Sequence, residues 1–143
     1  MFKRRKRRPL AVLLLGIILT GCQPGPKIVP VSGKVTYNGT ALKFGSVMFQ
    51  PDSGPLARGT IQTDGTFRLT TYADSDGCAV GTSKVRITCF QSQGEDVASQ
   101  AAAGEVPGGG LLIPKRYTSF GTSGITAEVR RGGKPFTFDL TDS

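Results

Sequence analysis

The chain has 143 residues and a formal net charge of +8, with 18 Lys and Arg against 10 Asp and Glu and no histidine. Six of the basic residues lie in the first 21 positions, which hold no acid, so the remaining chain has a net charge of only +2 (12 minus 10). That balance gives no basic stripe of the kind that binds nucleic acid. The lack of histidine excludes Ser-His-Asp catalysis, Cys-His catalysis and zinc sites that use histidine.

Residues 1–21 have the composition of a signal peptide. Residues 3–8 are all basic and precede an apolar stretch over 10–19 that only Gly16 interrupts. About ten apolar residues are too few to cross the roughly 30 Å hydrocarbon core of a bilayer, but they suffice for the apolar centre of a signal peptide. We therefore expect a signal-peptide helix that enters the general secretion route. The pair Arg7-Arg8 leaves the twin-arginine route as the alternative.

The leader ends in Leu19-Thr20-Gly21-Cys22, the pattern called a lipobox in bacterial lipoproteins. Small residues allow an extended backbone to enter a peptidase cleft, which predicts cleavage between Gly21 and Cys22. The Cys22 sulfur would then carry diacylglycerol, and palmitate or similar acyl chains would hold the protein at the membrane, because two or three chains anchor stably. The alternative is an ordinary secreted protein with a cysteine near its cleavage site. By resemblance to lipoproteins of diderm bacteria, Gln23 favours the outer membrane. The periplasmic face and the cell surface are both alternatives.

The mature chain predicts a short tether over 22–30 and one all-β domain over 31–142. The tether is rich in proline, which keeps it extended. Short runs of Val, Ile, Thr and Phe with period-two alternation are separated by Gly, Pro, Asn and Asp. They predict a seven-stranded antiparallel two-sheet sandwich with strands at 31–37, 46–50, 57–63, 66–71, 83–90, 125–129 and 136–140.

The alternation also predicts which side chains face the core. Residues 57–63 and 66–71 flank Asp64-Gly65 and predict a hairpin that points Ile61, Phe67 and Leu69 inward. The buried set includes Val35, Phe67, Val85, Ile87 and Phe138, and the exposed set is Arg68, Lys84 and Arg86.

Residues 91–110 interrupt the regular spacing of the strands. The segment holds three acids, Glu95, Asp96 and Glu105, no basic residue and little apolar surface. We expect a mobile loop that becomes ordered only against a partner, since the backbone entropy lost on ordering has little burial to offset it.

Two acids and two cysteines suggest possible chemistry. Asp74 and Asp76 stand beside Gly77, as in some calcium loops, but the full twelve-residue pattern is absent and a polar turn is favoured. Cys78 and Cys89 could form a disulfide in an oxidising compartment. The strand over 83–90 would hold the two cysteines too far apart, so we interpret Cys89 as a small core residue.

Cationic and aromatic residues give two further candidates. Lys115, Arg116 and the pair Arg130-Arg131 could bind acidic glycans or phospholipid headgroups, although scattered surface cations are the favoured interpretation. The three tyrosines could form a surface on which sugars stack, but packing at the core or sheet edge is favoured; they are Tyr37, Tyr72 and Tyr117.

One ordered set of turn and core residues carries a family resemblance: Val31-x-Gly33-x-Val35-x-Tyr37-Asn38-Gly39, Phe44-Gly45-x-Val47, Asp64-Gly65-x-Phe67 and Gly81-x-x-Lys84-Val85. Over residues 31–140 the chain resembles the carboxypeptidase-regulatory-like, transthyretin-like β-sandwich of many short bacterial lipoproteins, particularly those of planctomycetes. The resemblance implies an accessory, adhesive or structural module. Together with the lipid anchor and the lack of a catalytic constellation, it leads us to expect a non-enzymatic structural or binding module without a cofactor, whose partner is an envelope protein or glycan. The alternative is an accessory subunit that contributes Asp74, Asp76 or Lys115 to an envelope enzyme's site.

Overall fold

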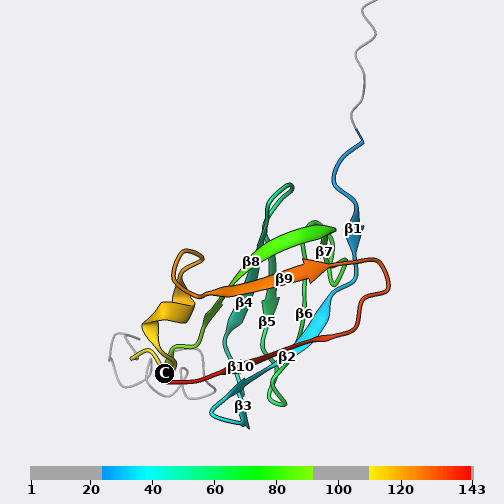
Figure 1. Ribbon diagram of the computed structural model, residues 1–143. Helices are drawn as coiled ribbons and strands as arrows, with labels where there is room; N and C mark the ends of the chain where they lie inside the picture. The colour runs from blue at the N-terminus through cyan, green and yellow to red at the C-terminus, as the bar shows by residue number, and fades with distance from the viewer. Residues whose placement is uncertain (1–23, 92–109, 143) are drawn as a thin grey trace, which may run out of the picture.

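The computed structural model of the chain describes residues 24–91 and 110–142 (Figure 1). The predicted leader, the lipobox with Cys22, and all of the predicted loop except Gln91 and Gly110 lie outside the described residues. Within them the chain is all-β with almost no helix, as the composition predicts.

The described residues contain ten strands and one 3-10 helix, joined by turns and loops. The strands are β1 (Ile28–Val29), β2 (Ser32–Tyr37), β3 (Thr40–Ala41), β4 (Ser46–Pro51), β5 (Ala57–Thr60), β6 (Thr66–Arg68), β7 (Cys78–Ala79), β8 (Gly81–Thr88), β9 (Ile125–Val129) and β10 (Phe136–Leu140), and the 3-10 helix is η2 (Lys115–Thr118). Each of the seven predicted stretches overlaps one strand. The additional strands β1, β3 and β7 have two residues each, too few to show a periodic pattern.

The strands form two four-stranded sheets and a small β1–β7 pair. One sheet has the order β5-β4-β8-β9 and is antiparallel throughout; in the other, β2 pairs with β10, β3 and β6. The expectation of a wholly antiparallel fold is wrong at β2 and β10, which run parallel from Gly33 opposite Phe136 to Tyr37 opposite Leu140. Alternation shows which face of a strand is buried but not which strand lies beside it, and here the chain crosses from the β9 sheet to the other sheet before β10.

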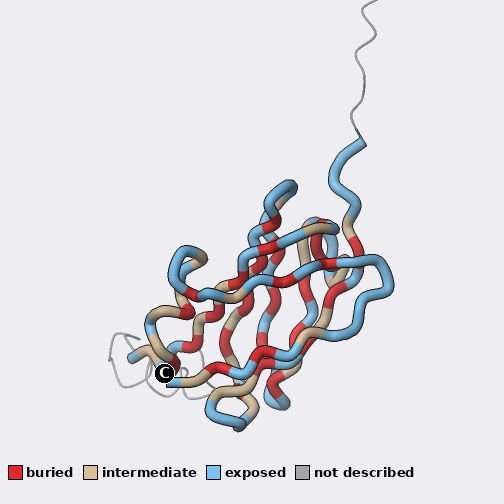
Figure 2. Tube along the Cα trace, viewed as in Figure 1, coloured by how far each residue is buried: buried red, intermediate tan, exposed pale blue. Residues whose placement is uncertain are grey.

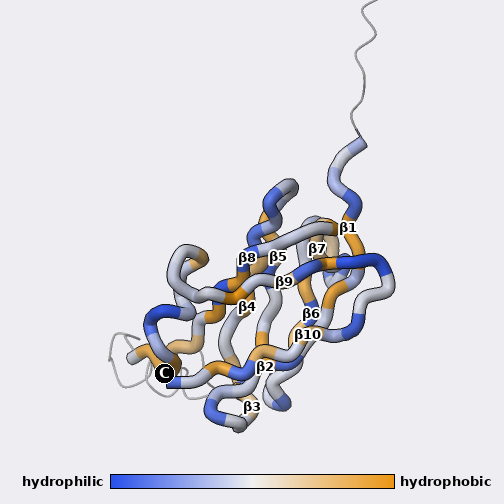
Figure 3. Tube along the Cα trace, in the orientation of Figure 1, coloured by the Kyte–Doolittle hydropathy of each residue, from blue (hydrophilic) through white to orange (hydrophobic). Residues whose placement is uncertain are grey.

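The core lies between the two four-stranded sheets. Phe49 of β4 packs against three rings of the opposite sheet, with centroid distances of 6.4 Å to Phe67, 5.7 Å to Phe136 and 6.0 Å to Phe138. Buried residues follow the strands, and exposed and hydrophilic residues gather at the turns (Figures 2 and 3). Full burial of a side chain such as Phe49 stabilises the fold by about 1.5–3 kcal/mol, so the aromatic cluster holds the two sheets face to face.

The predicted register is confirmed for the core. The five residues predicted to be buried are all at most 8% exposed: Val35, Phe67, Val85, Ile87 and Phe138. The two side chains Arg68 and Lys84 are exposed, as predicted. Arg86 is only half-buried, because its guanidinium carbon lies 5.1 Å from the Phe120 ring centroid and Nη2 contacts Met48 Sδ at 2.9 Å.

The predicted hairpin around Asp64-Gly65 exists but divides between the two sheets. Gln62 N–H donates to the Thr66 carbonyl over 2.8 Å, and Gly65 has a φ of +84°, which favours glycine. β5 nevertheless pairs with β4, and β6 pairs with β2. Arg58 and Thr70 exchange two main-chain hydrogen bonds, so the hairpin joins the two sheets along one side.

Candidate functional site

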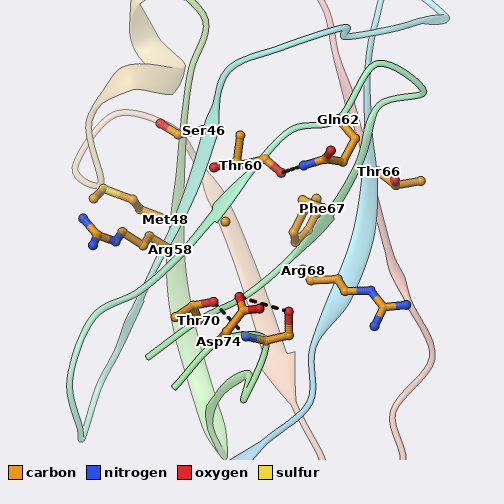
Figure 4. Close-up of a pocket in the computed structure, with 12 residues that line it drawn as sticks. Ser46, Met48, Arg58, Thr60, Gln62, Thr66, Phe67, Arg68, Thr70 and Asp74 are labelled. Carbon is orange, nitrogen blue, oxygen red and sulfur yellow. Dashed lines mark hydrogen bonds between the residues drawn. The ribbon is translucent and has the colours of Figure 1, made fainter. Parts of the chain in front are cut away.

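An open groove of about 760 Å³ lies on the outer surface where β4, β5 and β6 meet (Figure 4). Most of its lining side chains carry hydroxyl, amide or guanidinium groups. The lining residues are Ser46, Met48, Arg58, Gly59, Thr60, Gln62, Thr66, Phe67, Arg68, Thr70, Asp74 and Ser75.

Period-two alternation places the polar side chains of β4 and β5 on this surface. In β4, Val47 and Phe49 are buried, which turns Met48 to the outside. Arg58 lies directly opposite Met48 in the register of β4 and β5, so the two side chains are neighbours on the same face. The groove is therefore a consequence of the same register that builds the core.

Two arginines flank the groove. Figure 4 shows Arg58 on the side of Met48 and Arg68 on the opposite side, with the Phe67 ring between them. Both arginines are exposed, and in residues 24–91 and 110–142 neither has a carboxylate within 4.0 Å. Their positive charges are therefore not neutralised by a neighbouring acid, and they face solvent beside a polar surface.

Asp74 and Asp76 have different surroundings at one end of the groove. Asp76 accepts main-chain N–H bonds from Thr71 over 2.7 Å, Tyr72 over 2.9 Å and Ala73 over 3.0 Å. These bonds, that from Thr71 first, hold the pKa of Asp76 below its usual range. Asp76 is thus a residue that orders a turn, as the polar-turn interpretation requires, whereas Asp74 is exposed and lines the groove.

Lys115 lies far from these acids. It begins η2, and η2 and β7 lie at opposite ends of β8 (Figure 1). The 72–77 turn leads directly into β7, so the structure does not bring Lys115 together with Asp74 or Asp76. Any chemistry that uses these three residues would therefore involve separate surfaces of the domain.

Arg116 and Tyr117 bind the end of β10. Arg116 Nη2 donates to the Tyr117 hydroxyl and to the Thr141 carbonyl, each over 2.7 Å. The Tyr117 hydroxyl also accepts from Thr141 N–H and donates to the Thr141 carbonyl, each over 3.2 Å. The two side chains thereby occupy hydrogen-bonding positions that a neighbouring strand would otherwise fill, which agrees with packing at a sheet edge.

The three tyrosines do not form one surface. Tyr117 is buried, while Tyr37 donates a short hydrogen bond to Asp142 near the end of β10. That bond raises the pKa of Tyr37 and lowers the pKa of Asp142. Tyr72 is 71% exposed and belongs to the turn before β7, at the other end of the sheet from η2.

Cys78 and Cys89 are both buried free thiols. Cys78 lies in β7 before the start of β8, and Cys89 follows the end of β8, so the length of that strand separates them. Burial raises the pKa of both thiols, which disfavours their reactive thiolate forms. The interpretation of Cys89 as a small core residue is confirmed.

Arg130 and Arg131 are exposed in the connection between β9 and β10. Arg130 Nε lies 3.9 Å from Glu128 Oε1, and both side chains are more than half exposed. Such a pair contributes little to stability. These observations agree with the interpretation of Arg130 and Arg131 as scattered surface cations.

Arg58, Arg68 and the groove were not among the candidates that the sequence indicated. Each arginine stands at an outward position of an alternating strand, which is a common place for a cation. The two arginines come to flank one groove because β5 pairs with β4 and Arg58 bridges to Thr70, just after β6, and such pairing cannot be read from alternation alone.

No group of three or more Cys, Asp and Glu residues that could hold a metal ion occurs in the described part of the chain. None of the described helices is long and apolar enough to span a membrane. No family model matches the chain, and no curated protein or solved structure matches it.

Proposed function

We propose that the protein is a lipid-anchored module of the bacterial cell envelope with a binding or structural role and no enzymatic activity of its own. The observation that carries the binding role is the open, polar, arginine-flanked groove over β4, β5 and β6. The lipobox ending in Cys22 and the basic, apolar leader before it support the anchor. The proposed location is the outer membrane, as Gln23 favours.

The proposed fold family is the carboxypeptidase-regulatory-like, transthyretin-like β-sandwich. Its support is the order of glycine and core residues in the sequence, together with two facing sheets that share an aromatic core. In such a module the marked glycines serve turns and close packing, so they carry no chemistry. The function would then depend on outward-facing side chains.

The tether would keep the domain close to the membrane. β1 is fixed to the domain by its pairing with β7, and it begins at Ile28. Five residues lie between Cys22 and Ile28, which makes six steps along the chain. An extended chain spans about 3.4 Å per step, so a lipid on Cys22 would lie within about 20 Å of Ile28. A partner in the same membrane could therefore reach the domain.

The anchor is tested with Cys22→Ala in cells labelled with radioactive palmitate. We expect the variant to lose the label and to accumulate as full-length precursor, because no other side chain at the cleavage site can form the thioether. Thr20→Ser is the matched control, since it keeps a small residue before the cleavage site, and it should be labelled normally. A Cys22→Ala variant that is trimmed and released normally would contradict the lipoprotein assignment.

The alternative function is an accessory subunit that contributes a residue to a partner enzyme. The observation that favours it is the exposed Asp74 at the end of the groove. The two functions are separated by identifying what the groove contacts in intact cells. An enzyme whose turnover depends on Asp74, Asp76 or Lys115 would favour the alternative, and a glycan or a non-catalytic protein would favour the binding module.

A further inference from the structure

We propose that the groove over β4, β5 and β6 binds an acidic glycan, a polysaccharide whose sugar units carry carboxylates. This inference rests on the proposed binding role and names the ligand class of the same groove. Three properties of the lining carry it: its arginines without an ion-pair partner among the described residues, its hydroxyl and amide groups, and the main-chain bonds of Arg58 at the outer edge of β5.

The arginines select for negative charge. Arg58 lies opposite Met48 of β4 on one side and opposite Thr70, which follows β6, on the other, so neither residue paired with Arg58 is an acid. Met48 is also opposite Arg86 of β8, which adds a third cation to the same outer face. Guanidinium groups bind carboxylates through two parallel hydrogen bonds, so an anionic ligand along this face would gain both charge and geometry.

The remaining lining matches a ligand rich in hydroxyl groups. Its neutral polar side chains are Ser46, Thr60, Gln62, Thr66, Thr70 and Ser75. Some already bond within the protein, as Ser46 Oγ does with Thr88 Oγ1 over 2.7 Å and Thr70 Oγ1 with Ser75 N–H over 3.0 Å. A hydroxyl both donates and accepts, so these groups retain capacity for the hydroxyls of a sugar ring.

An extended peptide and a neutral sugar both fit less well. A peptide that adds a strand needs unpaired main-chain groups at a sheet edge, but at the outer edge of β5 Arg58 already exchanges two main-chain hydrogen bonds with Thr70. Neutral sugars commonly stack on an exposed aromatic ring. The aromatic side chain in the lining is Phe67, which is only 1% exposed.

Replacing Asp74 should change the affinity for the ligand in the opposite direction to replacing an arginine. Asp74 is the one acid among the lining residues, and it lies at the end of the groove beside Ser75. A carboxylated ligand would be repelled by Asp74 and attracted by Arg58 and Arg68. Removing the acid should therefore strengthen binding, while removing either arginine should weaken it.

The test measures equilibrium binding of the processed, lipid-anchored protein, purified in detergent, to polygalacturonate. The matched ligand is the methyl ester of the same polymer, which has the same backbone without the charge. We expect binding to polygalacturonate that weakens as salt is raised, and at least tenfold weaker binding to the ester. Dextran sulfate, as a second arm, distinguishes a preference for carboxylates from a preference for any polyanion.

Four variants connect the binding to the groove. Arg58→Gln and Arg68→Gln should each weaken binding about two- to fivefold, and Asp74→Asn should strengthen it about twofold. Lys115→Gln makes the same charge change at the far end of β8 and should have no effect. Melting temperatures of all four should match that of the parent protein, because each side chain is exposed.

Equal binding to polygalacturonate and its ester would overturn the inference, as would a loss in Lys115→Gln equal to the loss in the arginine variants. Preference for polyglutamate over polygalacturonate would overturn it in favour of an acidic polypeptide, and tighter binding to dextran sulfate in favour of a sulfated ligand. Crosslinking from the groove that captures a different envelope component would refute the acidic glycan while leaving the proposed binding role intact.

Discussion

The substitution Gly59→Ala, which adds one methyl group, tests how closely β5 of one sheet approaches β6 of the other. Gly59 lies in β5 opposite Val47, and a Cβ at this position would be 2.5 Å from the main-chain oxygen of Arg68 and 3.3 Å from Leu69 Cδ2. The first contact is with backbone, so no flexible side chain can move aside to relieve it. In Gly59→Ala, β6 must shift away from β5.

The expected cost follows from this overlap. Overpacking of a well-filled site destabilises by about 1–3 kcal/mol. For a domain of this size that corresponds to a fall in Tm of about 5–15 °C. The loss of backbone freedom in the unfolded chain, which stabilises an alanine variant by about 0.4–1 kcal/mol, reduces the fall without reversing it.

Thermal unfolding followed by circular dichroism measures the effect, with Gly121→Ala as the control. The nearest atom to a Cβ at Gly121 is Ser119 Oγ at 3.9 Å, so this variant should match the parent protein or exceed it slightly. Hydrogen exchange should also accelerate at the amides of Arg58 and Thr70, whose mutual bonds hold β5 to the residues that follow β6. If Gly59→Ala has the same Tm as Gly121→Ala, the close approach of β6 to β5 is wrong.

Three other perturbations test the core, a turn and the undescribed segment. Phe67→Ala should lower the free energy of unfolding by about 3–5 kcal/mol in urea titrations, because the ring is 1% exposed and packs against Phe49 and Phe138; a loss below about 1 kcal/mol would contradict its place in the core. The pKa of Asp76 is lower in the folded than in the unfolded state, so the stability that the ionised Asp76 contributes is present above its unfolded pKa and is lost as pH falls through its folded pKa. Asp76→Asn should therefore reduce the fall in Tm between pH 7 and pH 3. A fall in Tm equal to that of the parent protein would contradict this. Deletion of residues 94–108 should leave Tm nearly unchanged, whereas a loss of several degrees would show that the segment packs against the domain.

The strands and their buried faces could be predicted from the sequence because alternation is a local property. Val85 and Ile87 alternate with Lys84 and Arg86 within one strand, and no knowledge of neighbouring strands is needed to assign them to the inside. Alternation could not predict that Arg86 is partly buried. This burial arises from Phe120, 34 positions away (120 minus 86), whose ring faces the guanidinium.

Pairing was predictable only where a tight turn sets it. Asp64-Gly65 predicts a hairpin, and the bonds between Gln62 and Thr66 and between Arg58 and Thr70 follow from that turn. The parallel pairing of β2 with β10 depends on a crossing between sheets, which no local pattern specifies. The groove also depends on such non-local pairing, since its lining comes from β4, β5, β6 and the connections that follow β5 and β6.

The central claim, a tethered module that binds through its groove, is tested most directly by photocrosslinking in intact cells. A photoreactive residue in place of Gln62 lies in the groove, and one in place of Thr126 lies on β9 at the opposite edge of its sheet. We predict a discrete adduct from position 62 that disappears in Cys22→Ala and is absent from position 126. No adduct from position 62, or the same adduct from both positions, would contradict the claim.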